Sequence, residues 1–176
     1  MKAKDMTLTA VTAALICIAG PLSIAAGPVP LSLATFAVYL AGAVLGKKRG
    51  TLATALYLLI GIIGVPVFSG FSGGFQKLAG VTGGYLIGYL PCAFITGLGA
   101  ERAEKEGRAW LLPLLMAAGT AVLYAIGTAW FVIQTGNAAG AALSLCVVPF
   151  LPGDAAKIAA ATLLAAPVRR AACKYS

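Results

Sequence analysis

Six apolar stretches, separated by proline, glycine or short clusters of charge, fill almost the whole sequence. We place them at residues 6–26, 31–45, 51–65, 81–98, 110–133 and 152–168. A helix needs roughly 20 apolar residues to cross a bilayer. Only 10% of the residues are charged, against about 25% in a soluble domain. The sequence therefore predicts an all-α integral membrane protein with six transmembrane helices, forming a single domain over residues 1–176.

The basic residues are distributed unevenly along this predicted topology. With the N-terminus in the cytoplasm, 11 of the 13 basic residues fall on the cytoplasmic side, Lys77 falls outside, and Lys157 falls within a span. Positive charge concentrates in the cytoplasmic loops of membrane proteins. We therefore expect both termini in the cytoplasm. The same rule accounts for the net charge of +8, so a nucleic-acid partner is not needed to explain it.

Several kinds of chemistry are excluded by the residues that the sequence contains. The chain has no histidine, which excludes histidine acid–base catalysis and histidine metal sites. Its four cysteines are not in a metal-type spacing, and we interpret them as reduced packing residues. The segment from Gly42 to Lys48 has too few residues between its glycines for a phosphate-binding loop, and it lacks the Ser or Thr that binds magnesium. We predict no metal, no cofactor and no ATPase activity in this chain.

Asp154 and Lys157 are the two acidic or basic side chains that remain inside the apolar segments. An isolated charge in mid-membrane costs roughly 2.5–3.5 kcal/mol on insertion scales, so such residues usually face a bundle interior. The i, i+3 spacing places both on one helix face, within pairing range. We predict a ligand site with one acceptor and one cation, opening outward. The alternative is a structural salt bridge that fixes the sixth span to the bundle.

The loop before the fourth span carries three phenylalanines, Phe68, Phe71 and Phe75, and several glycines. Leaving each ring in water costs about 1.5–3 kcal/mol relative to burial. We expect the rings to fold down as a lid over an outward-facing cavity, with glycines such as Gly73 and Gly74 as hinges. The alternative is a loop that packs on the helix ends without a gating role.

The fourth span opens with a glycine-rich segment that contains Thr82, Gly83 and Tyr85. Free N–H groups and the positive end of the dipole at a helix N-terminus suit an anion or a carbonyl group. Glycine lets a ligand approach that backbone closely. Tyr85 and Tyr89 lie one turn apart on the same face. The alternative is a belt of interfacial tyrosines.

Three sequence motifs resemble those of a known family. They are Pro30-Leu-Ser-Leu-Ala-Thr35, Gly64-Val-Pro-Val-Phe68 with the following Gly-Gly-Phe and Thr-Gly-Gly-Tyr segments, and Pro149-Phe-Leu-Pro-Gly-Asp-Ala-Ala-Lys157. The chain is similar nearly end to end to the BioY family, the biotin-specific S components of energy-coupling factor (ECF) transporters. Two positions depart from the family pattern: Ala34 replaces a glutamine, and Val81 replaces a proline.

The resemblance implies a biotin-binding membrane subunit of an ECF-type ABC transporter, not an enzyme, in a prokaryotic cytoplasmic membrane. It implies a transmembrane T component and two cytoplasmic ATPases as partners, with ATP used only by those partners. Ala10 and Ala14 match the small-residue motif that contacts the T component. The candidate ligand-binding residues are Thr35, Phe68, Gly73, Gly74, Phe75, Thr82, Gly83, Tyr85, Asp154 and Lys157.

Biotin's chemistry suggests a role for each kind of side chain. We expect Asp154, with Thr82, to meet the ureido N–H groups, and Lys157 to meet a polar oxygen of the ligand. Phe75 and Tyr85 would form walls for the fused sulfur ring. Three alternatives remain: an S component for another small vitamin, a membrane-embedded enzyme, and a purely structural or assembly subunit.

Overall fold

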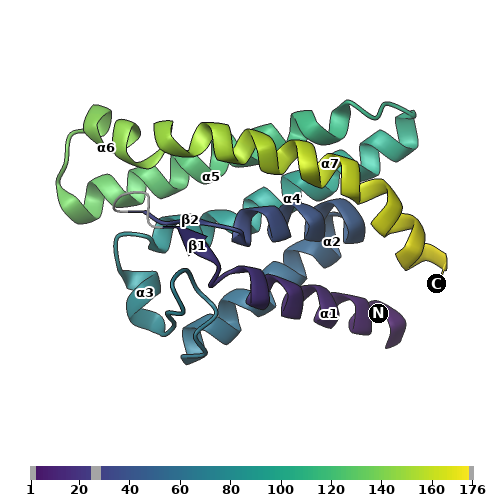
Figure 1. Ribbon diagram of the computed structural model, residues 1–176, viewed down its shortest axis with the longest axis horizontal. Coiled ribbons are helices and arrows are strands. Elements are labelled where there is room, and N and C mark those ends of the chain that lie inside the picture. Colours follow the sequence, from purple (N-terminus) through teal and green to yellow (C-terminus); the bar gives the residue numbers. More distant parts are fainter. Residues whose placement is uncertain (1–2, 25–28, 175–176) are drawn as a thin grey trace.

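The computed structural model describes residues 3–24 and 29–174, and most of these residues are helical (Figure 1). In chain order the elements are α1 (Ala3–Ala19), β1 (Ser23–Ile24), β2 (Leu31–Ser32), α2 (Ala34–Ile63), α3 (Phe75–Ala79), α4 (Gly83–Glu106), α5 (Leu111–Thr135), α6 (Ala139–Cys146), the 3-10 turn η1 (Val148–Phe150) and α7 (Leu151–Lys174). Three helical segments are long and apolar enough to cross a membrane: Gly83–Glu106, Leu111–Thr135 and Ala139–Ala171.

Helix α2 supplies two of the six predicted spans because it reverses direction at Gly46 (Figure 1). Gly46 has φ 77° and ψ 177°, a conformation that glycine adopts without a Cβ clash. The Glu101 carboxylate accepts a hydrogen bond from the Lys47 N–H at 3.0 Å, just after this break. The sequence predicted a loop at residues 46–50, and this was wrong: the chain turns at one residue and continues as helix.

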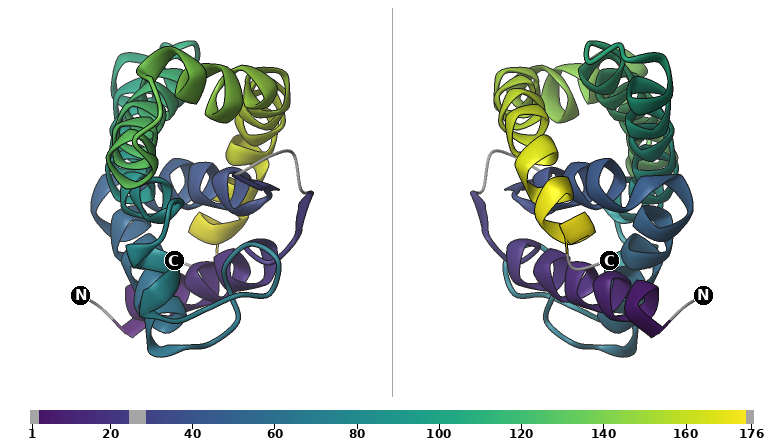
Figure 2. Two further views of the ribbon diagram at one scale, coloured as in Figure 1. Left: turned by 90° about the vertical axis from the view of Figure 1, so that its left-hand side faces the viewer. Right: turned by 90° about the vertical axis from the view of Figure 1, so that its right-hand side faces the viewer.

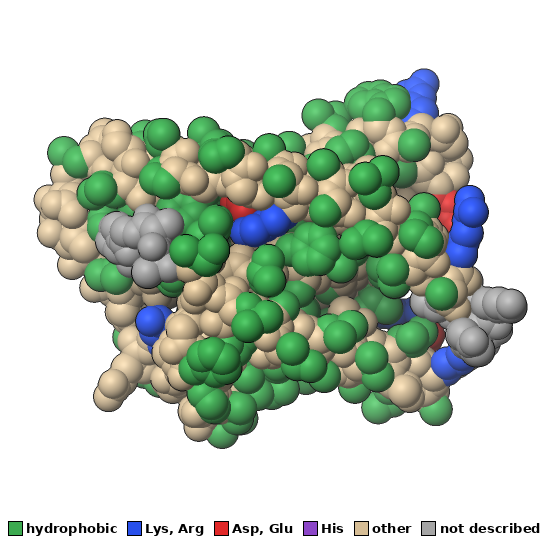
Figure 3. Space-filling model, in the orientation of Figure 1, with side chains coloured by type: hydrophobic (Ala, Val, Ile, Leu, Met, Phe, Trp, Pro, Cys, Tyr) green, Lys and Arg blue, Asp and Glu red, His purple; other side chains and the backbone are tan. Residues whose placement is uncertain are grey.

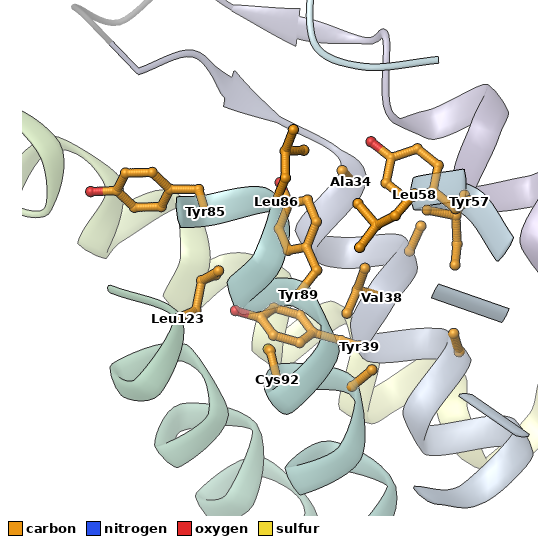
Figure 4. Packing of buried hydrophobic residues seen from close by; sticks show 14 of the residues in the cluster. Ala34, Val38, Tyr39, Tyr57, Leu58, Tyr85, Leu86, Tyr89, Cys92 and Leu123 are labelled. Carbon is orange, nitrogen blue, oxygen red and sulfur yellow. The ribbon is translucent and has the colours of Figure 1, made fainter. Parts of the chain in front are cut away.

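Close contact between the two arms of α2, and between α2 and α4, depends on glycine. A Cβ added at Gly50 would lie 2.7 Å from the Ala41 carbonyl oxygen, and one at Gly97 would lie 2.3 Å from the Lys47 nitrogen. Small residues let helix backbones approach in this way. In the core between these helices, the ring of Tyr39 lies beside Cys92 and Tyr89 (Figure 4).

Viewed end-on, α4 and α5 form one side of the bundle, α7 forms the opposite side, and α6 bridges them (Figure 2). Helix α2 crosses between these walls, and α1 lies beneath α2. The two chain ends lie at the same end of the molecule (Figure 1). Ion pairs link the helices at that end: Arg49–Asp5 at 2.9 Å, Lys47–Glu101 at 3.2 Å, and Arg169–Glu104.

The first span is shorter than the sequence predicted, and a small hairpin follows it. Helix α1 ends at Ala19 rather than near residue 26. Ser23 then pairs with Ser32, and Ile24 with Leu31, in an antiparallel ladder. Strands of two residues are too short to show an alternating pattern, so the sequence did not reveal them. The predicted short helix or cap at 141–150 is present as α6 and η1.

Candidate functional site

The predicted pair of charges lies at the start of α7. Lys157 Nζ is 2.9 Å from Asp154 Oδ1, and the two side chains are 11% and 6% exposed. Pro152 begins this helix well because its fixed φ suits the first turn. The i, i+3 spacing then directs both side chains toward the interior, as the sequence predicted.

The Lys157 ammonium is fully satisfied within the protein. Besides Asp154, it donates hydrogen bonds to the Ser32 carbonyl oxygen at 2.8 Å and to Thr35 Oγ1 at 2.9 Å. An ammonium group has three donors, and each has a partner here. Thr35 was a sequence candidate, whereas Ser32 was missed because its contact is through the backbone and carries no side-chain signal.

The other oxygen of the carboxylate has a partner that the sequence analysis also missed. Tyr124, on α5, donates a hydrogen bond to Asp154 Oδ2 at 2.5 Å. Asp154 is therefore held between Lys157 on its own helix and a tyrosine on the neighbouring helix. A tyrosine within an apolar span is a weak signal of such a role, because its hydroxyl usually finds a partner when buried.

Asp154, Lys157 and their hydrogen-bond partners border a cavity of about 40 Å³. Its lining residues are Val29, Pro30, Leu31, Ser32, Thr35, Tyr85, Tyr89, Leu123, Tyr124, Cys146, Phe150, Asp154 and Lys157. One red-and-blue patch lies at the centre of the face in Figure 3, among hydrophobic side chains and away from the charges near the termini. The cavity has mostly apolar walls and a few polar groups, which is typical of small-molecule sites.

A second cavity, of about 30 Å³, adjoins the first. Its lining residues are Val29, Pro30, Phe68, Ser69, Lys77, Thr82, Tyr85, Leu86 and Tyr89. Four residues, Val29, Pro30, Tyr85 and Tyr89, border both cavities. The Val29–Pro30 segment and the two tyrosines thus form a partition between them.

Tyr85 is held firmly at this partition. Its hydroxyl lies 3.2 Å from Thr128 Oγ1 on α5. Its ring packs against Gly127, where an added Cβ would lie 2.4 Å from the ring. Tyr85 and Tyr89 both face the cavities from successive turns of α4, as their spacing predicted.

The phenylalanine-rich loop is only partly buried. Phe68 has no exposed surface, and its ring packs edge-to-face on Tyr57, with centroids 5.6 Å apart. Phe71 and Phe75 are 69% and 66% exposed, so the prediction that all three rings fold down was wrong for these two. The positive φ at Phe71 and the position of Phe75 at the first turn of α3 direct both rings outward.

The candidate glycines and the small residues of α1 lie away from both cavities. A Cβ at Gly73 would lie 2.4 Å from the Val65 carbonyl oxygen, and one at Gly83 would lie 1.7 Å from the Leu78 carbonyl oxygen. Both glycines therefore permit close backbone packing, and Gly74 donates its N–H to the Gly61 carbonyl oxygen at 2.7 Å.

Ala10 and Ala14 are exposed on one face of α1. Within residues 3–24 and 29–174, no group of three or more His, Cys, Asp or Glu side chains could hold a metal ion. The site of Asp154 and Lys157 thus offers one acceptor, one cation and apolar walls, which suits binding of a small polar molecule.

Comparison with known proteins gives a consistent result. A family model described as the BioY family matches residues 1–174. The chain is 42% identical to the "Probable biotin transporter BioY" of Pyrococcus horikoshii, over 94% of this chain and 96% of the relative. It is 44% identical to the "Biotin transporter BioY" of Thermotoga maritima, over 89% and 90% of the two chains.

A solved structure has the same fold. The crystal structure of the S-component for biotin from an ECF-type ABC transporter superposes with a TM-score of 0.86 and 27% sequence identity. The match covers 96% of this chain and 92% of that chain.

Proposed function

The chain belongs to the BioY family, and from that premise we propose that it is the biotin-binding S component of an ECF-type ABC transporter. The observation that carries the proposal is the Asp154–Lys157 pair, which is nearly buried beside an apolar cavity. Ionisable residues within a membrane protein usually mark a substrate pathway or a ligand site, because burying them is costly.

The ureido ring of biotin matches this pair chemically. The ring presents N–H donors beside a carbonyl acceptor, and the pair presents a carboxylate beside an ammonium, 2.9 Å apart. One ligand edge can therefore bind both side chains at once, with one N–H group on Asp154 and the carbonyl oxygen on Lys157. The Tyr124 hydroxyl holds the carboxylate in position from α5.

Both cavities are smaller than biotin. Drug-sized ligands occupy pockets of about 300–1,000 Å³, whereas the two cavities here measure about 40 and 30 Å³. Biotin can enter only if the partition moves. Movement of Pro30 and of strand β2 would join the cavities, because Pro30 borders both of them and Ser32 of β2 accepts a hydrogen bond from Lys157.

We propose that residues 1–176 form one substrate-binding domain that spans a prokaryotic cytoplasmic membrane. Both termini would lie inside, and the cavities would open outward. The concentration of basic residues at the end that holds the termini supports this orientation. A T component and two ATPase subunits would supply the energy, with Ala10 and Ala14 on α1 facing the T component.

Titration calorimetry of biotin into the detergent-purified protein tests the proposal. The parent should bind biotin tightly, and Asp154→Asn and Lys157→Ala should each lose most of that affinity while remaining folded. A folded parent that binds no biotin would contradict the assignment. Thermal stabilisation by a different vitamin would then identify an S component of other specificity, because a ligand that binds only the folded state stabilises it by RT ln(1 + [L]/Kd). The absence of stabilisation by any vitamin would favour a structural subunit.

A further inference from the structure

We propose that Lys77 binds the carboxylate of biotin, at the opposite end of an elongated site from Asp154 and Lys157. This inference rests on the proposed function and adds a residue that determines ligand specificity. It begins from the two cavities, which hold different polar groups but share the walls formed by Val29, Pro30, Tyr85 and Tyr89.

Lys157 is poorly suited to a ligand carboxylate. Its ammonium lies 2.9 Å from Asp154 Oδ1, and its two remaining donors are occupied by Ser32 and Thr35. A second carboxylate at this position would stand against the first, and like charges at short range in a weakly polar site repel strongly. An anionic end of the ligand therefore needs a cation elsewhere.

Lys77 is the other basic residue among those that line the two cavities. It lies on α3, is half-buried, and forms no ion pair with any residue of the described chain. Helix α3, which carries it, lies at the end of the molecule opposite the termini (Figure 1). A half-buried, uncompensated ammonium at a cavity wall gains most from an incoming anion.

The surroundings of Lys77 also favour negative charge. Thr82, the residue that precedes the first turn of α4, borders the same cavity. The N-terminus of a long helix carries partial positive charge that stabilises an anion nearby. Lys77 and the start of α4 thus act in the same direction on a carboxylate between them.

The elongated shape of biotin fits two separate polar sites. Biotin carries its ureido ring at one end and its carboxylate at the other, joined by a flexible alkyl chain. The walls shared by the two cavities are valine, proline and two tyrosine rings, which are suitable contacts for an alkyl chain. The ring would bind at Asp154 and Lys157, and the chain would pass the partition toward Lys77.

The test compares biotin with biotinamide, in which a neutral carboxamide replaces the carboxylate. Calorimetry would measure both ligands with the parent, Lys77→Gln, Lys77→Arg and the control Lys48→Gln, whose lysine is exposed at the other end of the molecule. The parent should bind biotin about 10- to 100-fold more tightly than biotinamide, the range for one charge-assisted hydrogen bond. Lys77→Gln should bind the two ligands equally, while Lys77→Arg and Lys48→Gln should keep the preference for biotin.

Each other result overturns the inference. If Lys77→Gln keeps the preference, or weakens both ligands by the same factor while gel filtration shows a folded protein, Lys77 does not bind the carboxylate. Lys157→Gln is the reference for the ring end and should weaken both ligands alike. A folded parent that binds neither ligand would instead overturn the proposed function itself, so the two failures are distinguishable.

Discussion

Removing one charge from the Asp154–Lys157 pair should destabilise the protein far more than removing both. In Asp154→Asn, the Lys157 ammonium keeps two neutral oxygen partners, those of Ser32 and Thr35, but loses its counter-charge. In Lys157→Met, the carboxylate keeps only the hydroxyl of Tyr124. The double variant carries neither charge, so it leaves no uncompensated charge at the site.

The expected loss of stability follows from the burial of the pair. Both side chains are at most 11% exposed, so water screens them little. Breaking a buried pair from one side costs about 3–5 kcal/mol, whereas replacing the whole pair by neutral groups is often close to neutral. At roughly 2–4 °C per kcal/mol for a chain of this length, each single variant should lower the unfolding midpoint by about 6–20 °C. The double variant should lose clearly less than either single variant.

Thermal unfolding of the purified variants in one detergent, without ligand, measures this coupling. The surface pair Glu104–Arg169 is the matched control, because Glu104 is 68% exposed and such pairs contribute at most about 1 kcal/mol. Glu104→Gln should therefore shift the midpoint by only a few degrees. If the effects of Asp154→Asn and Lys157→Met add up in the double variant, the two charges do not depend on each other and the reasoning is refuted.

Two further substitutions test single contacts. Tyr124→Phe removes the hydroxyl that holds Asp154, a charge-assisted hydrogen bond worth about 1.5–3 kcal/mol, so biotin affinity in calorimetry should fall on the order of tenfold; an unchanged affinity would show that the carboxylate needs no such support. Gly61→Val places a Cβ 2.1 Å from Phe68 Cζ, and overpacking of this kind costs about 1–3 kcal/mol. Its unfolding midpoint should drop, and Phe68→Leu should restore part of the loss; an equal drop in both backgrounds would locate the strain elsewhere.

The six-span organisation was predictable because it depends on local properties of the sequence. Apolar stretches mark the helices, and clusters of basic residues mark their ends. The details that failed depend on distant contacts. The charged segment after Gly46 looks like a loop in isolation, yet Glu101 caps the helical arm that begins there, and these residues are 54 positions apart.

In the candidate site too, contacts between neighbours in the sequence were predictable and distant contacts were not. Asp154 and Lys157 were predictable as a pair because they are three residues apart on one helix. Their other partners were not, because Tyr124 is 30 residues from Asp154, and Ser32 is 125 residues from Lys157. Only the folded bundle brings those groups together, and no local pattern records the contact. The wrong prediction for Phe71 arose similarly, since its outward direction follows from a positive φ that apolar character does not reveal.

All three donors of the Lys157 ammonium already have acceptors, and this connects ligand binding with movement of the hairpin. Because each of its donors has a partner, a ligand oxygen can bind the ammonium only in exchange for an existing acceptor. We propose that the Ser32 carbonyl is the acceptor that leaves, since it belongs to a two-residue strand rather than to a helix. Its departure would carry the hairpin, and with it Pro30, away from the partition between the two cavities. Polar recognition by Lys157 and enlargement of the site would then be one event, because the exchange of acceptors that frees a Lys157 donor also moves a wall of both cavities.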